Sequence, residues 1–351
     1  MSLLYKIDWE ETKEKFKLWW DGKAEKPLIQ IFVQREKCNI AWDGWDLVRH
    51  WRRLDVVLKN FEAFASCTSF LGEAYPNLWI NLGPGVLAAY LGNSPKFVAN
   101  TVWFEEPKDW EELEDLEIKE NNAWWSYTKD IALELREKSR NKFVVGITDI
   151  GGVLDVAASL RGINNLMKDL YFNPQKVKIL LDKIIELWHD CYNELYDLLE
   201  GGRQGTSAWM NLWSPLKWYP IQCDYAYMLS PKLFKEFSLP YLVEQCERLD
   251  HPLYHLDGVG QIVHLDDLLK IENLRGIQWV PGEGKPDVSS EIWLNMYKKI
   301  IGKDKNLVLS GMPFEKVNSF LSNFSAKELG RILIQTWTSD YFKALELLNK
   351  I

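Results

Sequence analysis

The stretch HPLYHLDG, residues 251–258, combines a short apolar run with two chemically active side chains, His255 and Asp257. Residues i and i+2 of a β-strand point to the same side of the sheet, so the histidine and the aspartate face one way. Polar side chains at the carboxyl end of a buried parallel strand are typical of an α/β active site. The stretch therefore predicts a strand over residues 252–257 that ends in catalytic groups.

Seven other apolar runs of this kind occur along the chain, and helical patterns separate them. In one such pattern, residues 173–202, Asn173 and Pro174 open a long amphipathic segment that Gly201 and Gly202 end. Alternating strands and helices predict parallel strands joined by right-handed crossovers. Eight such units in 351 residues predict an α/β protein with a (β/α)8 architecture, a TIM barrel. The predicted strands are residues 27–33, 78–83, 142–149, 205–213, 252–257, 274–280, 306–311 and 331–338.

We expect one domain over residues 1–351, because no linker or internal repeat divides the chain. Residues 1–26 form an N-terminal helical extension in this interpretation. An insertion lies between the second and third strands, and its segment PKFVANTVWFEEP, residues 95–107, predicts a small hairpin.

Charge and composition exclude several classes of protein. The net charge of −8 argues against a nucleic-acid-binding surface. No run of eighteen apolar residues predicts a membrane helix, and early charges argue against a secretory signal. The five scattered cysteines, without a Cys-x-x-Cys pair, indicate a reduced, cytoplasmic protein. The 18 tryptophans are explained either by a Trp-rich core or by a pocket that stacks flat ligands.

Candidate functional residues follow the predicted strands, since barrel enzymes place their chemistry at the carboxyl ends of strands. The predicted catalytic residues are His255, Asp257, Asp149 and Asp224. A neutral imidazole beside a carboxylate acts as base and orienter, or both bind one metal ion. Two glycines after Asp149 let backbone approach a bound group. The predicted substrate-binding residues are Arg35, Asn81, Trp209, Asn211, Gln278, Trp279, Glu283, Met312 and Trp337.

Several candidates also have a purely structural interpretation. The His255–Asp257 pair is then a hydrogen bond that holds a loop, and Asp149 is an Asx-turn or a helix cap. Asp224 then only initiates a turn, and Glu283 is an exposed loop charge. Arg35 either clamps a carboxylate or forms a surface ion pair.

Three segments resemble the uroporphyrinogen decarboxylase superfamily. Residues 146–184 begin GITDIGGVLDVAASL, and residues 223–258 read CDYAYMLSPKLFKEFSLPYLVEQCERLDHPLYHLDG. The third segment is NLVLSGMPFEKV, residues 306–317. The resemblance runs over residues 140–340 and implies a (β/α)8 barrel.

The resemblance implies two different activities. The true decarboxylases bind a polycarboxylated tetrapyrrole without a cofactor, through an arginine-rich motif near the N-terminus. This chain has VQREK, residues 33–37, in place of that motif. The other branch contains corrinoid-linked methyltransferases, with zinc on a His-x-Cys pair and on a cysteine after the eighth strand. Here the pair is His255-x-Asp257, and LIQTWTSD, residues 333–340, has no cysteine.

We therefore expect a methyltransferase-like enzyme with an altered site. The resemblance implies a divalent metal such as zinc on His255, Asp257 and Glu283, and a corrinoid carried by a partner protein. The alternatives are a cofactor-free decarboxylase or lyase acting on an acidic tetrapyrrole-like ring, a glycoside-active barrel, and a non-catalytic binding module. A small-molecule substrate is expected for the enzymes, and an oligomer is compatible with the sequence.

Overall fold

The structure, a computed structural model, describes residues 2–34, 42–98 and 101–351. It is a mixed α/β fold around a seven-stranded sheet of order β2-β1-β13-β12-β11-β10-β9. Six strands run parallel, and β2 pairs antiparallel with β1. The strands of this sheet are β1 (Leu28–Gln34), β2 (Thr68–Gly72), β9 (Trp218–Gln222), β10 (His251–Asp257), β11 (Gly276–Val280), β12 (Asn306–Ser310) and β13 (Ile332–Thr338).

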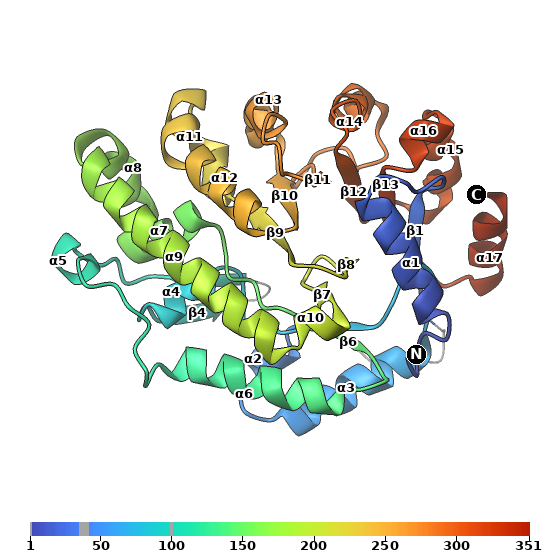
Figure 1. The fold of residues 1–351 in the computed structure, drawn as a ribbon, viewed down its shortest axis with the longest axis horizontal. Helices are drawn as coiled ribbons and strands as arrows, with labels where there is room; N and C mark the ends of the chain where they lie inside the picture. The colour runs from blue at the N-terminus through green and yellow to red at the C-terminus, as the bar shows by residue number, and fades with distance from the viewer. Residues whose placement is uncertain (1, 35–41, 99–100) are drawn as a thin grey trace.

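Most residues of the parallel strands are buried, as expected for strands that are covered on both faces. In β12, for example, Leu307, Val308 and Leu309 are all buried. Helices lie around the strands (Figure 1). The main covering helices are α9 (Pro174–Leu198), α12 (Leu239–Arg248), α14 (Leu294–Ile301) and α17 (Tyr341–Lys350).

Five of the eight predicted strands are confirmed as β1, β10, β11, β12 and β13. The second and third predictions are found as short pieces, β3 (Asn77–Trp79) and β6 (Val144–Gly146). These two pair in parallel with each other. Among the described residues neither belongs to the seven-stranded sheet, whose edges are β2 and β9.

The fourth predicted strand, 205–213, is wrong. Residues 206–214 form a small antiparallel pair, β7 (Thr206–Ser207) with β8 (Trp213–Ser214), around an irregular turn. The strand that joins the sheet is β9, which the sequence analysis missed. Its central Pro220 lacks an N–H, and proline favours edge strands; β9 is indeed at the sheet edge. The antiparallel β2 was also not predicted.

The end of β6 lies beside β9 through hydrogen bonds rather than strand pairing. The Tyr219 hydroxyl donates to the carbonyl of Thr148 at 2.7 Å and accepts from the N–H of Ile150 at 2.7 Å. The N–H of Ile147 donates to the carbonyl of Ser207 at 2.8 Å. These contacts bring the turn after Asp149 next to the carboxyl end of β9.

The N-terminal extension and the predicted hairpin are present. Helix α1 (Trp9–Trp20) buries Phe16 and Trp19, and the Trp20 indole donates to the carbonyl of Trp213 at 2.9 Å. Strands β4 (Pro95–Val98) and β5 (Thr101–Phe104) pair antiparallel. Many tryptophans belong to the core: Trp19, Trp188, Trp218 and Trp279 are fully buried.

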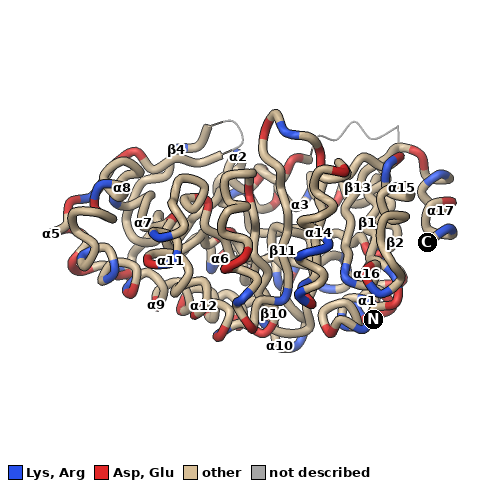
Figure 2. The backbone as a smooth tube through the Cα atoms, turned by 90° about the horizontal axis from the view of Figure 1, so that it is seen from above, with Lys and Arg blue, Asp and Glu red and all other residues tan. Residues whose placement is uncertain are grey.

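Acidic and basic residues are interspersed along the outer elements (Figure 2). Among the described helices, none has the length and apolar character needed to cross a membrane. Cys191, Cys223 and Cys246 are free and buried. Cys67 is disulfide-bonded, so the expectation of a fully reduced chain is wrong at that residue.

The contact between the turn after β6 and β9 can be tested at Gly152. A Cβ atom there would lie 2.2 Å from the carbonyl oxygen of Gln222 and 2.3 Å from a carboxylate oxygen of Asp155. We expect Gly152→Ala to lower the free energy of unfolding by about 1–3 kcal/mol, as overpacking does. Urea unfolding measures this. Gly202→Ala is the control, because its nearest atom is 3.8 Å away; equal stability of the two variants contradicts the close approach.

Candidate functional site

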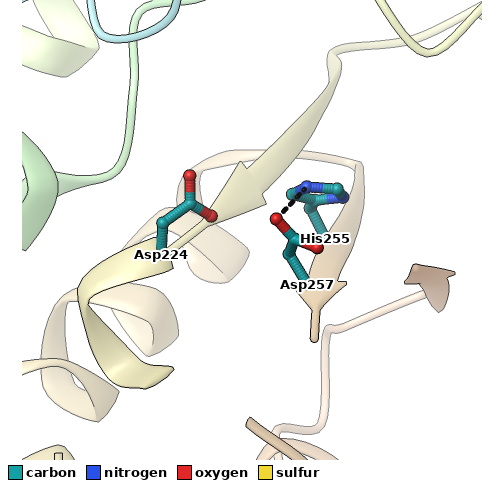
Figure 3. A group of neighbouring side chains, drawn as sticks. All are labelled: Asp224, His255 and Asp257. Atoms are coloured by element: carbon teal, nitrogen blue, oxygen red, sulfur yellow. Dashed lines mark ion pairs between the residues drawn. The ribbon is translucent and has the colours of Figure 1, made fainter. Parts of the chain in front are cut away.

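Asp224, His255 and Asp257 converge at the carboxyl ends of β9 and β10 (Figure 3). Each offers one ligand atom, and these atoms all lie within 4.8 Å of one another. His255 Nε2 is 4.0 Å from Asp257 Oδ2. The i, i+2 spacing predicted that His255 and Asp257 share one side, and the structure adds Asp224 from the helical turn that follows the neighbouring strand β9.

Asp155, which the sequence analysis did not single out, positions Asp224. It lies in the first turn of α7 (Val153–Arg161). Its two carboxylate oxygens accept hydrogen bonds from the backbone N–H groups of Asp224, at 2.9 Å, and Tyr225, at 2.8 Å. These N–H groups belong to the first two residues of the short helix η1 (Asp224–Met228). Asp155 therefore holds the backbone of Asp224 in position.

His255 is held on two sides. Its Nδ1 is hydrogen-bonded to Gln278 Oε1, the residue directly opposite it on β11. The Trp209 ring meets the imidazole edge-on, with centroids 5.1 Å apart and planes at 86°. Burial lowers the pKa of His255, and the nearby Asp257 carboxylate opposes that shift. The imidazole is therefore fixed in position and favoured in its neutral form.

Three aspartates around the site have pKa values raised to about 7. Burial is the main cause for Asp149, Asp155 and Asp224, and repulsion among the carboxylates adds to it. Asp224 is accessible to solvent even though protein surrounds it, because it lines an open cavity. Asp149 instead accepts the N–H of Gly151 at 2.9 Å, the Asx-turn foreseen as its structural interpretation.

A cavity of about 580 Å³ adjoins Asp224. Its walls come from α7, the hairpin strand β5, β9 and η1. Most of the lining is apolar, including Trp103, Ile163 and Met228. Of the described lining residues, the charged ones are Asp155 and Asp224, both acidic. The cavity therefore suits a small molecule with an apolar part and does not suit a polycarboxylated one.

A layer of polar side chains crosses the inside of the sheet next to His255. Gln278, Ser310, Gln335 and Gln30 come from β11, β12, β13 and β1, and each is hydrogen-bonded to the next. Of these four residues, only Gln278 was predicted from the sequence as a site residue. The dipeptide Ile-Gln at residues 29–30, 221–222, 277–278 and 334–335 was the available signal.

The structure brings together His255, Asp257, Asp224, Trp209 and Gln278, with Asp149 behind Asp224. The other predicted residues have different surroundings. The Asn211 carbonyl accepts from Gln30, and Asn81 bonds to the backbone of Gly44 and Gly83. The Met312 carbonyl accepts from Thr336, and Trp337 stacks on Phe32.

Trp279 and Glu283, two further predicted substrate-binding residues, also have different surroundings. Trp279 is fully buried and packs against Trp293, because its neighbour Gln278 takes the inner face of β11. Glu283 is exposed on the loop after β11 and is not one of the three converging ligands. Arg35 lies outside the described residues.

The chain shares its fold with a methyltransferase from Methanosarcina mazei. The TM-score is 0.61 at 15% sequence identity, and the match covers 97% of this chain and 98% of that protein. No protein-family model matches the chain, and no curated protein matches its sequence.

The buried carboxyl groups make stability depend on pH. A carboxyl group whose pKa is about 7 in the folded state and about 4 when unfolded holds its proton more tightly in the folded chain. Its contribution to the free energy of unfolding is thus present at low pH and lost as pH rises from about 4 to about 7. We expect metal-free Asp224→Asn to lose less stability between pH 5 and pH 8 than the unaltered chain, by about 1 kcal/mol after discounting solvent screening.

Urea unfolding in EDTA at each pH gives the required values. The control is Asp266→Asn, an exposed carboxylate paired with Lys299. If Asp224→Asn follows the same pH dependence as this control, the raised pKa of Asp224 is contradicted.

Proposed function

We propose that this chain is a metal-dependent, methyltransferase-like enzyme, with Asp224, His255 and Asp257 as metal ligands. The observation that carries the proposal is the convergence of their three ligand atoms within 4.8 Å, beside a cavity of about 580 Å³. The fold shared with a methyltransferase supports the same class at a coarse level.

The donor set fits a divalent cation. Zinc binds imidazole nitrogen and carboxylate oxygen at about 2.0–2.2 Å, which places two ligands of a tetrahedral ion about 3.5 Å apart. His255 Nε2 and Asp257 Oδ2, 4.0 Å apart, are near that spacing and too far apart for a hydrogen bond. One imidazole with two carboxylates is a hard ligand set, which suits zinc or a comparable divalent ion.

The chemistry follows from the ligands and the cavity. Asp224, His255 and Asp257 would hold a divalent ion, which would polarise a carbonyl or hydroxyl oxygen of the substrate. In methyl transfer, the acceptor's lone pair forms the new bond to carbon, the donor keeps the electron pair of the broken bond, and the acceptor's proton leaves to water. Asp155 and Gln278 keep Asp224 and His255 in position, and the apolar cavity wall binds the rest of the acceptor. A corrinoid on a partner protein is the proposed methyl donor.

The finer fold assignment belongs to this proposal as well. We propose that β3 and β6 complete one (β/α)8 barrel domain with the seven-stranded sheet, as in the uroporphyrinogen decarboxylase superfamily. The hydrogen bonds of Tyr219 to Thr148 and Ile150 support this arrangement, because they connect the edge strand β9 with the segment that follows β6.

The other activities gain less support from the site. A polycarboxylated tetrapyrrole requires cationic partners, and the described cavity lining carries only acidic charges. Glycoside chemistry uses a pair of carboxyl groups, whereas Asp224 and Asp257 share their site with the His255 imidazole as a third ligand. A binding module would not need a fixed imidazole beside two carboxylates.

Substitution of one ligand tests the metal site. We expect Asp257→Asn to weaken Zn²⁺ binding at least a hundred-fold, since even changes outside the ligand shell cost ten- to a hundred-fold. Stability should change little, because the Asp257 side chain is 42% exposed. Isothermal titration with Zn²⁺ and elemental analysis of the dialysed protein measure this.

Methyl transfer is tested with methylcobalamin and a panel of thiol and hydroxyl acceptors, followed through the corrinoid absorption spectrum. Asp266→Asn serves as the control, because its exposed carboxylate lies outside the triad. A wild-type chain that binds no divalent metal and leaves the corrinoid spectrum unchanged with every acceptor overturns the proposal.

A further inference from the structure

We infer that Ser310, Gln335 and Gln30 act as positioning residues that determine which nitrogen of His255 is free to bind the metal. None of the three is one of the candidate ligands. They act through a directed chain of hydrogen bonds that crosses β1, β13, β12 and β11 and ends on His255. The direction of every bond in the chain follows from backbone carbonyl groups at its far end.

The direction of this series of hydrogen bonds is set first at Gln335. Its side chain contacts the backbone carbonyl of Met210 at 2.8 Å, and a carbonyl oxygen only accepts hydrogen bonds. The amide nitrogen of Gln335 must therefore face Met210, which leaves Oε1 on the other side as an acceptor. Gln30 provides a second anchor, because its amide nitrogen donates to the carbonyls of Glu73, at 3.0 Å, and Asn211, at 2.9 Å. Gln30 Oε1 then accepts from Gln335 Nε2 at 2.7 Å.

The direction passes from Gln335 to Gln278 through Ser310. Gln335 Oε1 only accepts, so the single hydroxyl proton of Ser310 points to it, at 2.6 Å. The Ser310 oxygen has no further proton and must accept from Gln278 Nε2, at 3.1 Å. The opposite amide orientation would place two acceptors against each other. Gln30, Gln278 and Gln335 are all at least 95% buried, so exchange of these bonds with solvent is disfavoured.

The last hydrogen bond of the series fixes the tautomer of His255. Because Gln278 presents Oε1 to the imidazole, Nδ1 carries the proton and donates to it. In the neutral ring Nε2 then has a lone pair and no proton. That lone pair faces Asp257 Oδ2 across 4.0 Å, with no proton between the two acceptors. The tautomer follows from the hydrogen bonds alone, and its consequence for metal affinity rests on the proposed function.

The first test reads the tautomer without metal. Protein labelled with ¹⁵N-histidine is treated with EDTA, and long-range ¹H–¹⁵N spectra distinguish protonated from unprotonated ring nitrogens. The chain has five histidines, and the His255 signals are identified by their loss in His255→Gln. We expect Nδ1–H in the unaltered chain. In Ser310→Ala the Gln278 amide is free to rotate, and an Nε2–H population should appear.

The second test measures Zn²⁺ affinity by titration. Ser310→Ala should weaken binding about ten- to a hundred-fold, the range typical of residues outside the ligand shell. Gln278→Glu should keep the Nδ1–H form and bind Zn²⁺ within several-fold of the unaltered chain, because a carboxylate also accepts from Nδ1. Thr336→Val is the matched control, since Thr336 is buried beside Gln335 and its hydroxyl donates to the Met312 carbonyl rather than to the layer.

The results separate the two proposals. An Nε2–H tautomer in the unaltered chain overturns the inference, as does a Ser310→Ala variant whose tautomer and Zn²⁺ affinity match those of Thr336→Val. An Nδ1–H tautomer that shifts in Ser310→Ala supports the inference even where no Zn²⁺ binds, and in that case only the proposed function fails.

Discussion

The structure depends on one constraint: polar side chains buried inside the sheet must find hydrogen-bond partners, because an unpaired buried group costs about 1–3 kcal/mol. Gln30, Gln278 and Gln335 interrupt otherwise apolar strands, and Ser310 ends another. Each pairs with the next across the sheet. A slip of any of these strands by one residue would remove its Gln or Ser from the layer, so the polar layer also specifies the strand register.

The same layer connects the site to the core of the protein. Its far end holds the carbonyls of Met210 and Asn211, in the irregular turn between β7 and β8. Asn211 has a φ of 54°, and its side chain accepts from Asn77 on β3. Trp209 precedes these residues and contacts His255. The imidazole thus lies between Gln278, at the end of the layer, and Trp209, which comes from the turn that the layer holds. These two contacts explain how a residue at a strand end is kept in position.

Much of the sheet was predictable because β-branched runs and parallel crossovers leave strong patterns, and the His255–Asp257 pair was predictable from its spacing at a strand end. The fourth strand was not, since SAWMNLW reads as apolar and β9 contains Pro220. The polar layer could not be predicted for another reason. The hydrogen-bond partner of a single glutamine in a strand is not known until the strand register is known. Neighbouring residues of a strand point to opposite faces of the sheet, so Gln278 and Trp279 could not both face the site. Both were nevertheless predicted to be site residues.

The composition of the site also bears on the kind of substrate it favours. The resemblance placed a thiolate where this chain has Asp257, and a carboxylate is the harder ligand. In the proposed site, with His255 neutral, two carboxylates would balance the charge of one divalent ion, so no excess charge would remain to repel an electron-rich acceptor. Both carboxylate oxygens of Asp155 accept hydrogen bonds from backbone N–H groups, and Asp149 accepts one from the N–H of Gly151. Among these three raised-pKa aspartates, Asp224 is therefore the one left for ligand chemistry. If the proposed metal site forms, this ligand set and this cavity would together favour an oxygen acceptor with an apolar body.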